Sequence, residues 1–300
     1  MTIKAAIDLG TNSLRLIIAD TLTNPITILS DTSYMCRVGE SLHKTGKLSA
    51  DVMERTHQHF IEIQEIISKY PVSSINFAAT SALRDANNSE EFNQMVKSTG
   101  LEMTIISGEE EARIISKSVN HYLPRIADNS VFIDQGGGSV EFIHHYNNSE
   151  TYQSLDIGIV RLNEQFLKTS PPIFTNISTY RQFLKNRLYS SLPAIADTQP
   201  KQLIILGGTA TTLGMLQHKL SEYDSEIVHG TMLNKDLLIH SIQRIQALTA
   251  IEIQKNYKLA EKRADIFLAG LIEIDEILNF FSISSFTVCD KGLRYGLLLN

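Results

Sequence analysis

The chain has 300 residues, of which 43% are hydrophobic and 20% are charged, a composition typical of soluble globular proteins. Its net charge of −6, with no dense basic run, argues against DNA, RNA or membrane-surface binding driven by overall charge. It has no apolar stretch of the roughly 18 residues that a membrane helix needs, and its two cysteines, Cys36 and Cys289, lie far apart. We therefore expect a cytoplasmic protein without disulfides, membrane helices or nucleic-acid partners.

In the first half, apolar periodicity and capping residues alternate between helix and strand. Ser49 is a suitable N-cap for a helix that ends before Pro71. The pattern predicts a helix over 49–70, a strand over 75–79, a helix from 89, a strand over 101–106 and a helix from 109. Such alternation favours a sheet covered by helices, with a boundary near 121–125.

The second half shows the same alternation but ends with longer helices. Strands are expected over 131–143, 151–155, 203–206 and 285–289. Helices are expected from about 160, interrupted by Pro171 and Pro172, and over 234–248 and 262–281. Two α/β domains follow from this order.

An internal repeat links the two halves. At a constant offset of 126, Ile7, Asp8, Gly10, Ser13 and Ile17 recur as Ile133, Asp134, Gly136, Ser139 and Ile143. Each copy has an apolar strand that ends in Asp, then a tight Gly/Ser turn, then a second strand. This repeat predicts two related domains that face each other, with one acidic turn from each.

Glycine-rich turns of this kind can cradle phosphate oxygens with successive backbone N–H groups and hydroxyls. Three such turns occur, at 8–13, 134–139 and 207–212, the last containing Gly207, Gly208 and Thr209. A single turn could merely need glycine for a hairpin, but three together favour phosphate binding. None is a P-loop or a clean G-x-G-x-x-G motif.

Carboxylates beside these turns could hold a divalent cation. Asp8 and Asp134 end equivalent strands, and Glu141 lies just beyond the second turn. Such side chains can bridge a cation to phosphate oxygens, although each Asp could instead cap its own turn. Their repetition favours the cation.

The sequence Glu109-Glu110-Glu111-Ala-Arg begins a predicted helix. Acidic residues there stabilise the helix dipole, and one of them could also be the general base that orients a water toward a phosphoryl group. Arginines near predicted turns could clamp phosphate: Arg15, Arg37 and Arg84.

Histidine pairs do not indicate zinc. His57 and His59, two apart on a helix, point to different faces, and His144 and His145 alternate across a strand. The sequence also has no G-x-S-x-G elbow of an acyl hydrolase.

Nine ordered blocks along the chain resemble the exopolyphosphatase / guanosine pentaphosphate phosphohydrolase family, within the actin–sugar kinase–Hsp70 superfamily. The blocks are 6–16, 37–49, 79–87, 106–113, 134–141, 158–162, 207–212, 263–270 and 292–296. At 300 residues the chain resembles the short, two-domain members.

The resemblance implies two actin-like (ribonuclease H-like) domains, over 1–122 and 123–300, with a cleft between them. It implies that Glu111 is the catalytic base, although the residues alone leave Glu110 open. It also implies a phosphate and Mg²⁺ site lined by Asp134 and the second glycine-rich turn, with further polar residues opposite. These residues are Gly136, Gly137, Gly138 and Ser139 on one side and Asn12, Ser13, Arg15 and Arg84 on the other. Arg263 is expected to contact across the cleft.

Two positions depart from the family pattern. Gln135 stands where an apolar residue is usual, and Asp156-Ile-Gly replaces Pro-Leu-Gly. Since side chains alternate along a strand, Gln135 should point away from the phosphate turn. We expect Gln135→Ile to alter packing and leave turnover unchanged.

The resemblance implies hydrolysis of the terminal phosphate of inorganic polyphosphate, of guanosine pentaphosphate, or of both, and a homodimer. Two alternatives use the same cleft: an actin-like ATPase or small-molecule kinase, and a non-catalytic sensor of a phosphorylated nucleotide. The Glu-Glu-Glu-Ala-Arg block favours the hydrolase.

Overall fold

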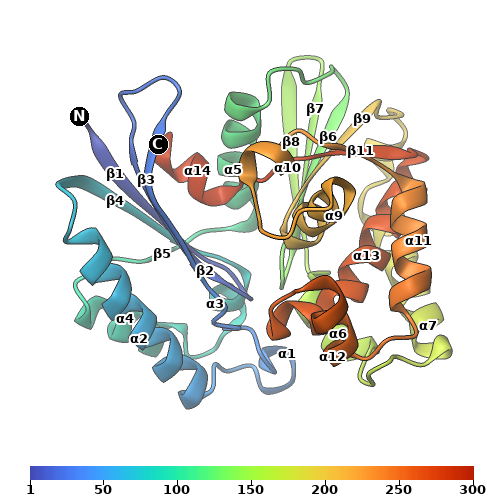
Figure 1. The fold of residues 1–300 in the computed structure, drawn as a ribbon, viewed down its shortest axis with the longest axis horizontal. Helices are drawn as coiled ribbons and strands as arrows, with labels where there is room; N and C mark the ends of the chain where they lie inside the picture. The colour runs from blue at the N-terminus through green and yellow to red at the C-terminus, as the bar shows by residue number, and fades with distance from the viewer.

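Two mixed β-sheets, one in each lobe of the molecule, organise the chain in the computed structural model, which describes residues 1–300 (Figure 1). The first sheet contains β1 (Ile3–Leu9), β2 (Leu14–Asp20), β3 (Thr27–Tyr34), β4 (Val72–Ala79) and β5 (Thr104–Ile105). The second contains β6 (Ser130–Gln135), β7 (Val140–Tyr146), β8 (Ser149–Leu155), β9 (Gln202–Leu206), β10 (Met232–Asn234) and β11 (Ser285–Val288).

The strand orders confirm the predicted duplication. The first sheet runs β3-β2-β1-β4-β5, and the second, read in the same direction, runs β8-β7-β6-β9-β11 with β10 added at the edge. In both sheets, the first three strands in this order form antiparallel pairs. The fourth strand, β4 or β9, is parallel to its neighbour, β1 or β6. The predicted fold class, two actin-like α/β domains, is confirmed.

The two hairpins that carry the repeat close in the same way. In β1–β2, the Gly10 N–H donates to the Ser13 carbonyl at 2.9 Å, and in β6–β7 the Gly136 N–H donates to the Ser139 carbonyl at 3.1 Å. The offset of 126 residues therefore aligns equivalent atoms, as the sequence predicts.

Five helices belong to the first half. They are α1 (Leu42–Thr45), α2 (Ala50–Ile67), α3 (Ser81–Asp85), α4 (Ser89–Ser98) and α5 (Gly108–Tyr122). Ser49 caps α2 as predicted, since its Oγ accepts the Val52 N–H at 3.3 Å. The strand expected over 101–106 is much shorter, because only Thr104 and Ile105 form β5 beside β4.

Nine helices belong to the second half. They are α6 (Ile159–Phe166), α7 (Phe174–Ser191), α8 (Pro193–Ala196), α9 (Gly208–His218), α10 (Ser225–Val228), α11 (Lys235–Ile245), α12 (Ala250–Tyr257), α13 (Glu261–Phe281) and α14 (Leu293–Leu298). Pro171 and Pro172 separate α6 from α7, as predicted.

Two helices lie between the sheets (Figure 1). Helix α5 packs against β6, β7 and β8 of the second sheet, and α14 packs against β1, β2 and β4 of the first. Together with the facing strands they form one buried apolar cluster, which includes Ala6, Ile114, Phe132 and Tyr295. Each half of the chain thus contributes a helix to the other sheet, and the domain boundary after residue 122 stays a prediction.

No helix combines the length and the hydropathy needed to cross a membrane. Cys36 and Cys289 are both free thiols in the interior, as expected for a chain without disulfides.

Candidate active site

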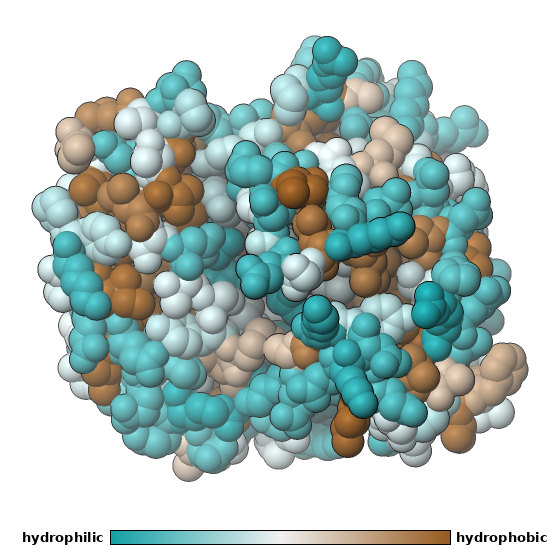
Figure 2. Space-filling view, in the orientation of Figure 1, coloured by the Kyte–Doolittle hydropathy of each residue, from teal (hydrophilic) through white to brown (hydrophobic).

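A cavity of about 100 Å³ lies between the two halves, at the point where the three glycine-rich turns meet. Figure 2 shows a recess between the lobes with a mostly hydrophilic rim. The cavity is lined by most of the residues that the sequence singles out: Asp8, Asn12, Ser13, Arg15, Glu111, Asp134, Gly136, Gly137, Gly138, Ser139, Gly207, Gly208, Thr209 and Arg263. The topology thus brings together residues that are as much as 255 positions apart, Asp8 and Arg263.

Glu111 enters the cavity from the first turn of α5. The Ser107 hydroxyl caps this helix by accepting the Glu110 N–H at 3.1 Å, which fixes where the turn begins. Glu111 is only 6% exposed, and its Oε2 accepts a hydrogen bond from Arg84 Nη1 at 2.8 Å. Glu110 points elsewhere, because its carboxylate pairs with Arg113 on the outer face of α5. This geometry favours Glu111 over Glu110 as the base.

Arg84, at the end of α3, joins the two halves of the site. Besides Glu111, it donates to the Ile106 carbonyl at 3.0 Å and to Ser139 Oγ at 3.2 Å. The Ser139 hydroxyl donates in turn to Glu141 Oε1 at 2.7 Å. Arg84 therefore orients the side chain of Glu111 relative to the second glycine-rich turn.

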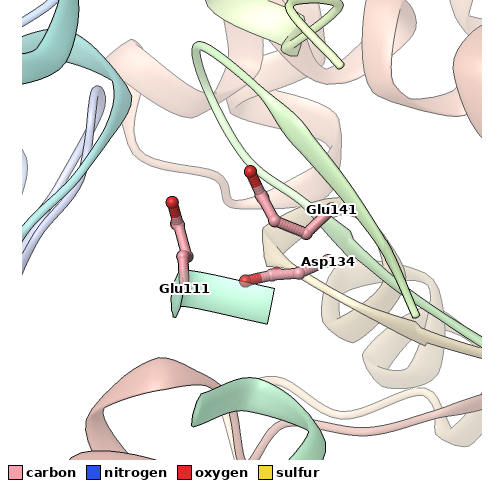
Figure 3. A group of neighbouring side chains, drawn as sticks. All are labelled: Glu111, Asp134 and Glu141. Atoms are coloured by element: carbon pink, nitrogen blue, oxygen red, sulfur yellow. The ribbon is translucent and has the colours of Figure 1, made fainter. Parts of the chain in front are cut away.

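Three carboxylates converge beside this turn. Glu111, Asp134 and Glu141 each place one oxygen within 4.8 Å of the others (Figure 3). Burial, with the neighbouring Glu141 charge as the next cause, raises the pKa of Asp134 to about 7. The same two causes raise the pKa of Glu111 well above its ordinary value. Three acids this close repel one another strongly when ionised.

These side chains fit a hard divalent cation. Carboxylate oxygens are the ligands that Mg²⁺ and Ca²⁺ prefer, and a cation would relieve the repulsion among the three acids. The cluster contains Asp134 and Glu141, which the sequence predicts as ligands, but it contains Glu111 in place of Asp8. Asp8 lines the same cavity, so its role in holding a cation stays a prediction.

Two hydroxyls in the cavity were missed by the sequence analysis. Thr11 Oγ1 and Ser81 Oγ are buried and have no hydrogen-bond partner. Both face Gly138, where an added Cβ would lie 2.6 Å from Thr11 Oγ1. Only a glycine at position 138 lets these two side chains come so close to the turn. Since both hydroxyls lack a protein partner, they are free to bond a ligand oxygen. Both residues lie within motif blocks, but only the fold shows that they face each other.

Two arginines in the cavity lack carboxylate partners. Neither Arg15 nor Arg263 forms an ion pair or a side-chain hydrogen bond with the protein, and both line the cavity. Burial, and then the Arg15 charge, lowers the pKa of Arg263. Two unpaired cations whose charges repel each other favour an anionic ligand between them.

A second cavity of about 310 Å³ shares Asp8, Arg15, Asp134, Gly207, Gly208, Arg263 and Leu293 with the first. Its further lining is mainly polar, with Ser33, Thr211 and Arg294 among the contributors. The two cavities therefore adjoin each other.

Several candidates lie outside these cavities. Arg37 forms an ion pair with Asp265 across the two halves. Neither histidine pair belongs to the cluster of possible metal ligands, Glu111, Asp134 and Glu141. Gln135 lines the cavity, but its side-chain amide points away toward Glu273, as alternation predicts; Asp156 is exposed.

A family model described as the Ppx/GppA phosphatase family matches residues 17–300. Exopolyphosphatase 2 of Mycobacterium tuberculosis is 27% identical over 314 residues, covering 100% of this chain and 98% of that protein. The structure of the Aquifex aeolicus PPX-GPPA enzyme is similar with a TM-score of 0.82 and 31% identity, covering 99% of each chain. An exopolyphosphatase structure from Cytophaga hutchinsonii has a TM-score of 0.92 and 25% identity, covering 99% of this chain and 97% of that one.

The matches extend over nearly the whole chain and agree with the motif blocks, so the predicted family and enzyme class are confirmed. With its buried carboxylates and its glycine-rich turns in one cleft, this phosphohydrolase belongs to the Ppx/GppA phosphatase family.

Proposed function

We propose that this enzyme releases the terminal phosphate of inorganic polyphosphate and that Glu111 orients the attacking water. The observation that carries the proposal is the setting of the Glu111 carboxylate. One oxygen is held by Arg84 at 2.8 Å, and the other has no protein partner at the wall of the cavity. A general base needs this combination of a fixed position and a free oxygen near the reacting group.

The terminal phosphoryl group would lie against the 136–139 turn. Backbone N–H groups and the Ser139 hydroxyl line that place, and Arg84, which is not among the lining residues, donates to Ser139 Oγ. The free hydroxyls of Thr11 and Ser81 approach from the other half. Fixed donors of this kind stabilise the charge that develops on the oxygens in phosphoryl transfer.

Asp134 and Glu141 would hold a divalent cation, for which Mg²⁺ is our first candidate. The cation would neutralise charge on the phosphate oxygens. Hydrogen bonds from Ser139 and Ser154, at 2.7 and 2.8 Å, fix the orientation of the Glu141 carboxylate. Such support for a ligand is typical of metal sites.

The rest of the substrate would extend into the second cavity. The first cavity, about 100 Å³, is the smaller of the two, and the second adjoins it. The second cavity is mainly polar and carries the unpaired Arg15 and Arg263, together with Arg294, which pairs with Asp31. Its lining also contains the carboxylates of Asp8, Asp134 and Asp290. The two unpaired arginines suit a linear phosphate chain, and relatives named exopolyphosphatase support the same substrate.

Guanosine pentaphosphate is the second candidate, and one observation favours it. Tyr223, 49% exposed, lies in the wall of the second cavity. An aromatic ring there offers a face on which a guanine base can stack.

The test measures phosphate release at fixed Mg²⁺ from short polyphosphate, long polyphosphate, guanosine pentaphosphate and ATP. Glu111→Gln should abolish release, and Glu110→Gln is the matched control, since Glu110 begins the same helix but pairs with Arg113 outside the cavity. Release from guanosine pentaphosphate alone would replace the proposed substrate. Release from ATP alone would indicate an ATPase or kinase, and binding without release a sensor.

A Mg²⁺ titration separates the role of base from that of ligand. If Glu111 is the base, Glu111→Gln lowers kcat and leaves the Mg²⁺ concentration for half-maximal activity unchanged. If Glu111 is mainly a ligand, that concentration rises. The homodimer and the cytoplasmic location remain parts of the proposal, to be tested by scattering and by fractionation of cells.

A further inference from the structure

Gln135 makes an unusual buried contact behind the active site. It ends β6, directly after Asp134, and its Nε2 donates to Glu273 Oε2 at 2.7 Å and to the Gly270 carbonyl at 2.9 Å. Both acceptors belong to α13. The amide therefore joins the end of the second glycine-rich hairpin to a helix 135 or more residues away.

The hydrogen bond from Gln135 is the only polar contact of the Glu273 carboxyl. Glu273 is completely buried in the middle of α13, and it forms no ion pair. Burial, opposed only by the hydrogen bond from Gln135, raises the pKa of Glu273 well above its ordinary value. A buried carboxyl is costly unless it is satisfied, and the bond from Gln135 satisfies one of the two Glu273 oxygens.

The equivalent position in the first hairpin shows that the turn itself does not need this contact. At the offset of 126, Gln135 corresponds to Leu9, which is fully buried among apolar side chains. Both hairpins nevertheless close with the same hydrogen bond. The polar pair is therefore specific to the second hairpin and to its connection with α13.

One side of α13 touches the active site at three successive places. Arg263 lies beside Gly208, Gly270 lies against the Thr209 side chain so closely that a Cβ would overlap it, and Glu273 holds Gln135. These positions are 7 and 3 residues apart, the spacing of one helix face. A shift of α13 would therefore move Arg263, the 207–209 turn and the end of β6 together.

We infer that Gln135 and Glu273 are positioning residues, which fix the glycine-rich turn 134–139 against α13 and so set the distance between that turn and Arg263. The inference rests on the proposed function, because the turn and Arg263 are then two sides of one phosphate site. Glu273 lies outside the cavity lining, whereas the end of β6 at Gln135 forms part of it.

The experiment compares Glu273→Leu, Glu273→Gln and the double variant Gln135→Leu/Glu273→Leu with the wild type. Kinetics on polyphosphate give kcat and KM, calorimetry gives the affinity for orthophosphate, and hydrogen exchange reports the amides of 136–139. Glu273→Leu should raise KM and weaken orthophosphate binding about tenfold, the size of one displaced hydrogen bond, and speed exchange in the turn. Glu273→Gln, which keeps an acceptor for Gln135, should stay within about twofold of wild type.

The double variant places leucine at 135 as the first hairpin does, and it should recover most of the lost affinity. Asp275→Asn is the matched control, since Asp275 is a buried acid on α13 that pairs with Arg181 instead. It should lower the melting temperature without changing KM or exchange in the turn. Expression and melting curves show whether each variant folds.

Three results would overturn the inference: a Glu273→Leu protein that melts earlier with KM and exchange unchanged, a Glu273→Gln protein as impaired as Glu273→Leu, or the same loss in Asp275→Asn. A wild type that does not hydrolyse polyphosphate would refute the proposed function alone, because orthophosphate binding and amide exchange would still test the positioning role.

Discussion

The two glycine-rich hairpins share a backbone but carry opposite charges at one equivalent position. In the first, Asp8 lies across from Arg15 in the strand register; in the second, Asp134 lies across from Glu141. Arg15 and Glu141 correspond at the offset of 126. The same hairpin, used twice, thus places a positively charged side chain at this position in one half and a carboxylate in the other.

The electrostatic consequence appears in the two aspartates. Burial raises the pKa of Asp8, but Arg15 and Arg294 oppose the increase. Burial raises the pKa of Asp134 to about 7, and Glu141 and Asp8 add to the increase while Arg15 opposes it. The repulsion that a bound cation would relieve is therefore stronger at the second hairpin. The two hairpins keep the same backbone geometry and differ in charge through single residues.

Among the variants that test this difference between the hairpins, Glu141→Gln should have the largest effect. Removing one charge from the cluster should raise the Mg²⁺ concentration for half-maximal activity at least about 100-fold, because a directly coordinating oxygen counts for more than a supporting one. A Mg²⁺ titration of phosphate release measures it. An unchanged Mg²⁺ requirement would show that Glu141 is no ligand.

Arg15→Gln makes the equivalent change in the first hairpin and should have a different effect. Loss of a charge-assisted hydrogen bond to phosphate should raise KM for polyphosphate about 10- to 100-fold. The Mg²⁺ requirement should stay as in the wild type. If both glutamine variants alter the Mg²⁺ requirement equally, the proposed division between the hairpins is wrong.

Gly138→Ala should have a smaller effect, on stability as well as binding. The new methyl group would meet the Thr11 and Ser81 hydroxyls, and such overpacking costs about 1–3 kcal/mol. Asn12→Ala, at the equivalent position of the first hairpin, adds no atoms and serves as the control. Chemical denaturation measures the difference, and equal stability of the two variants would refute the steric argument.

The pH dependence of stability should show the smallest effect. The pKa of Glu273 is raised in the folded protein, so above about pH 4.5 the unfolded chain binds fewer protons than the folded one and stability falls as pH rises. Glu273→Gln removes this loss, so its melting temperature relative to wild type should increase from about pH 5 to pH 8. The nearby Tyr180 has a raised pKa and does not titrate in this range. A difference in melting temperature between Glu273→Gln and the wild type that stays constant over this pH range would contradict the prediction.

Much of this molecule is predictable from local sequence. The repeat at an offset of 126 identifies both hairpins, and Ser107 with the following acids locates the start of α5 and hence Glu111. These features depend on turn chemistry and capping within a few residues. They predicted two related α/β domains and the three glycine-rich turns, whereas the actin-like fold, Glu111 as the base and Arg263 were implied by the family resemblance.

Contacts between distant segments could not be predicted in this way. The approach of Thr11 and Ser81 to Gly138 and the bond between Gln135 and Glu273 depend on how the sheets and α13 pack. The alternation of side chains along β6 predicts the direction of the Gln135 side chain but not its partner, Glu273. The exclusion of Asp8 from the carboxylate cluster likewise results from which strands face α5.

The exchange of α5 and α14 between the sheets has a mechanical consequence. Gly296 of α14 packs so closely against the Ile114 carbonyl of α5 that a Cβ atom would overlap it. The two helices thus form a closely packed pair between the lobes, which could serve as a hinge axis. If the lobes rotate about this helix pair, residues far from it move further than residues beside it. Glu111, one turn from Ile114, would keep its place while Arg37 and Asp265, joined across the two halves, would swing apart. Under the proposed function, such a rotation would open the rim to a phosphate chain while the carboxylates around Glu111 stay together.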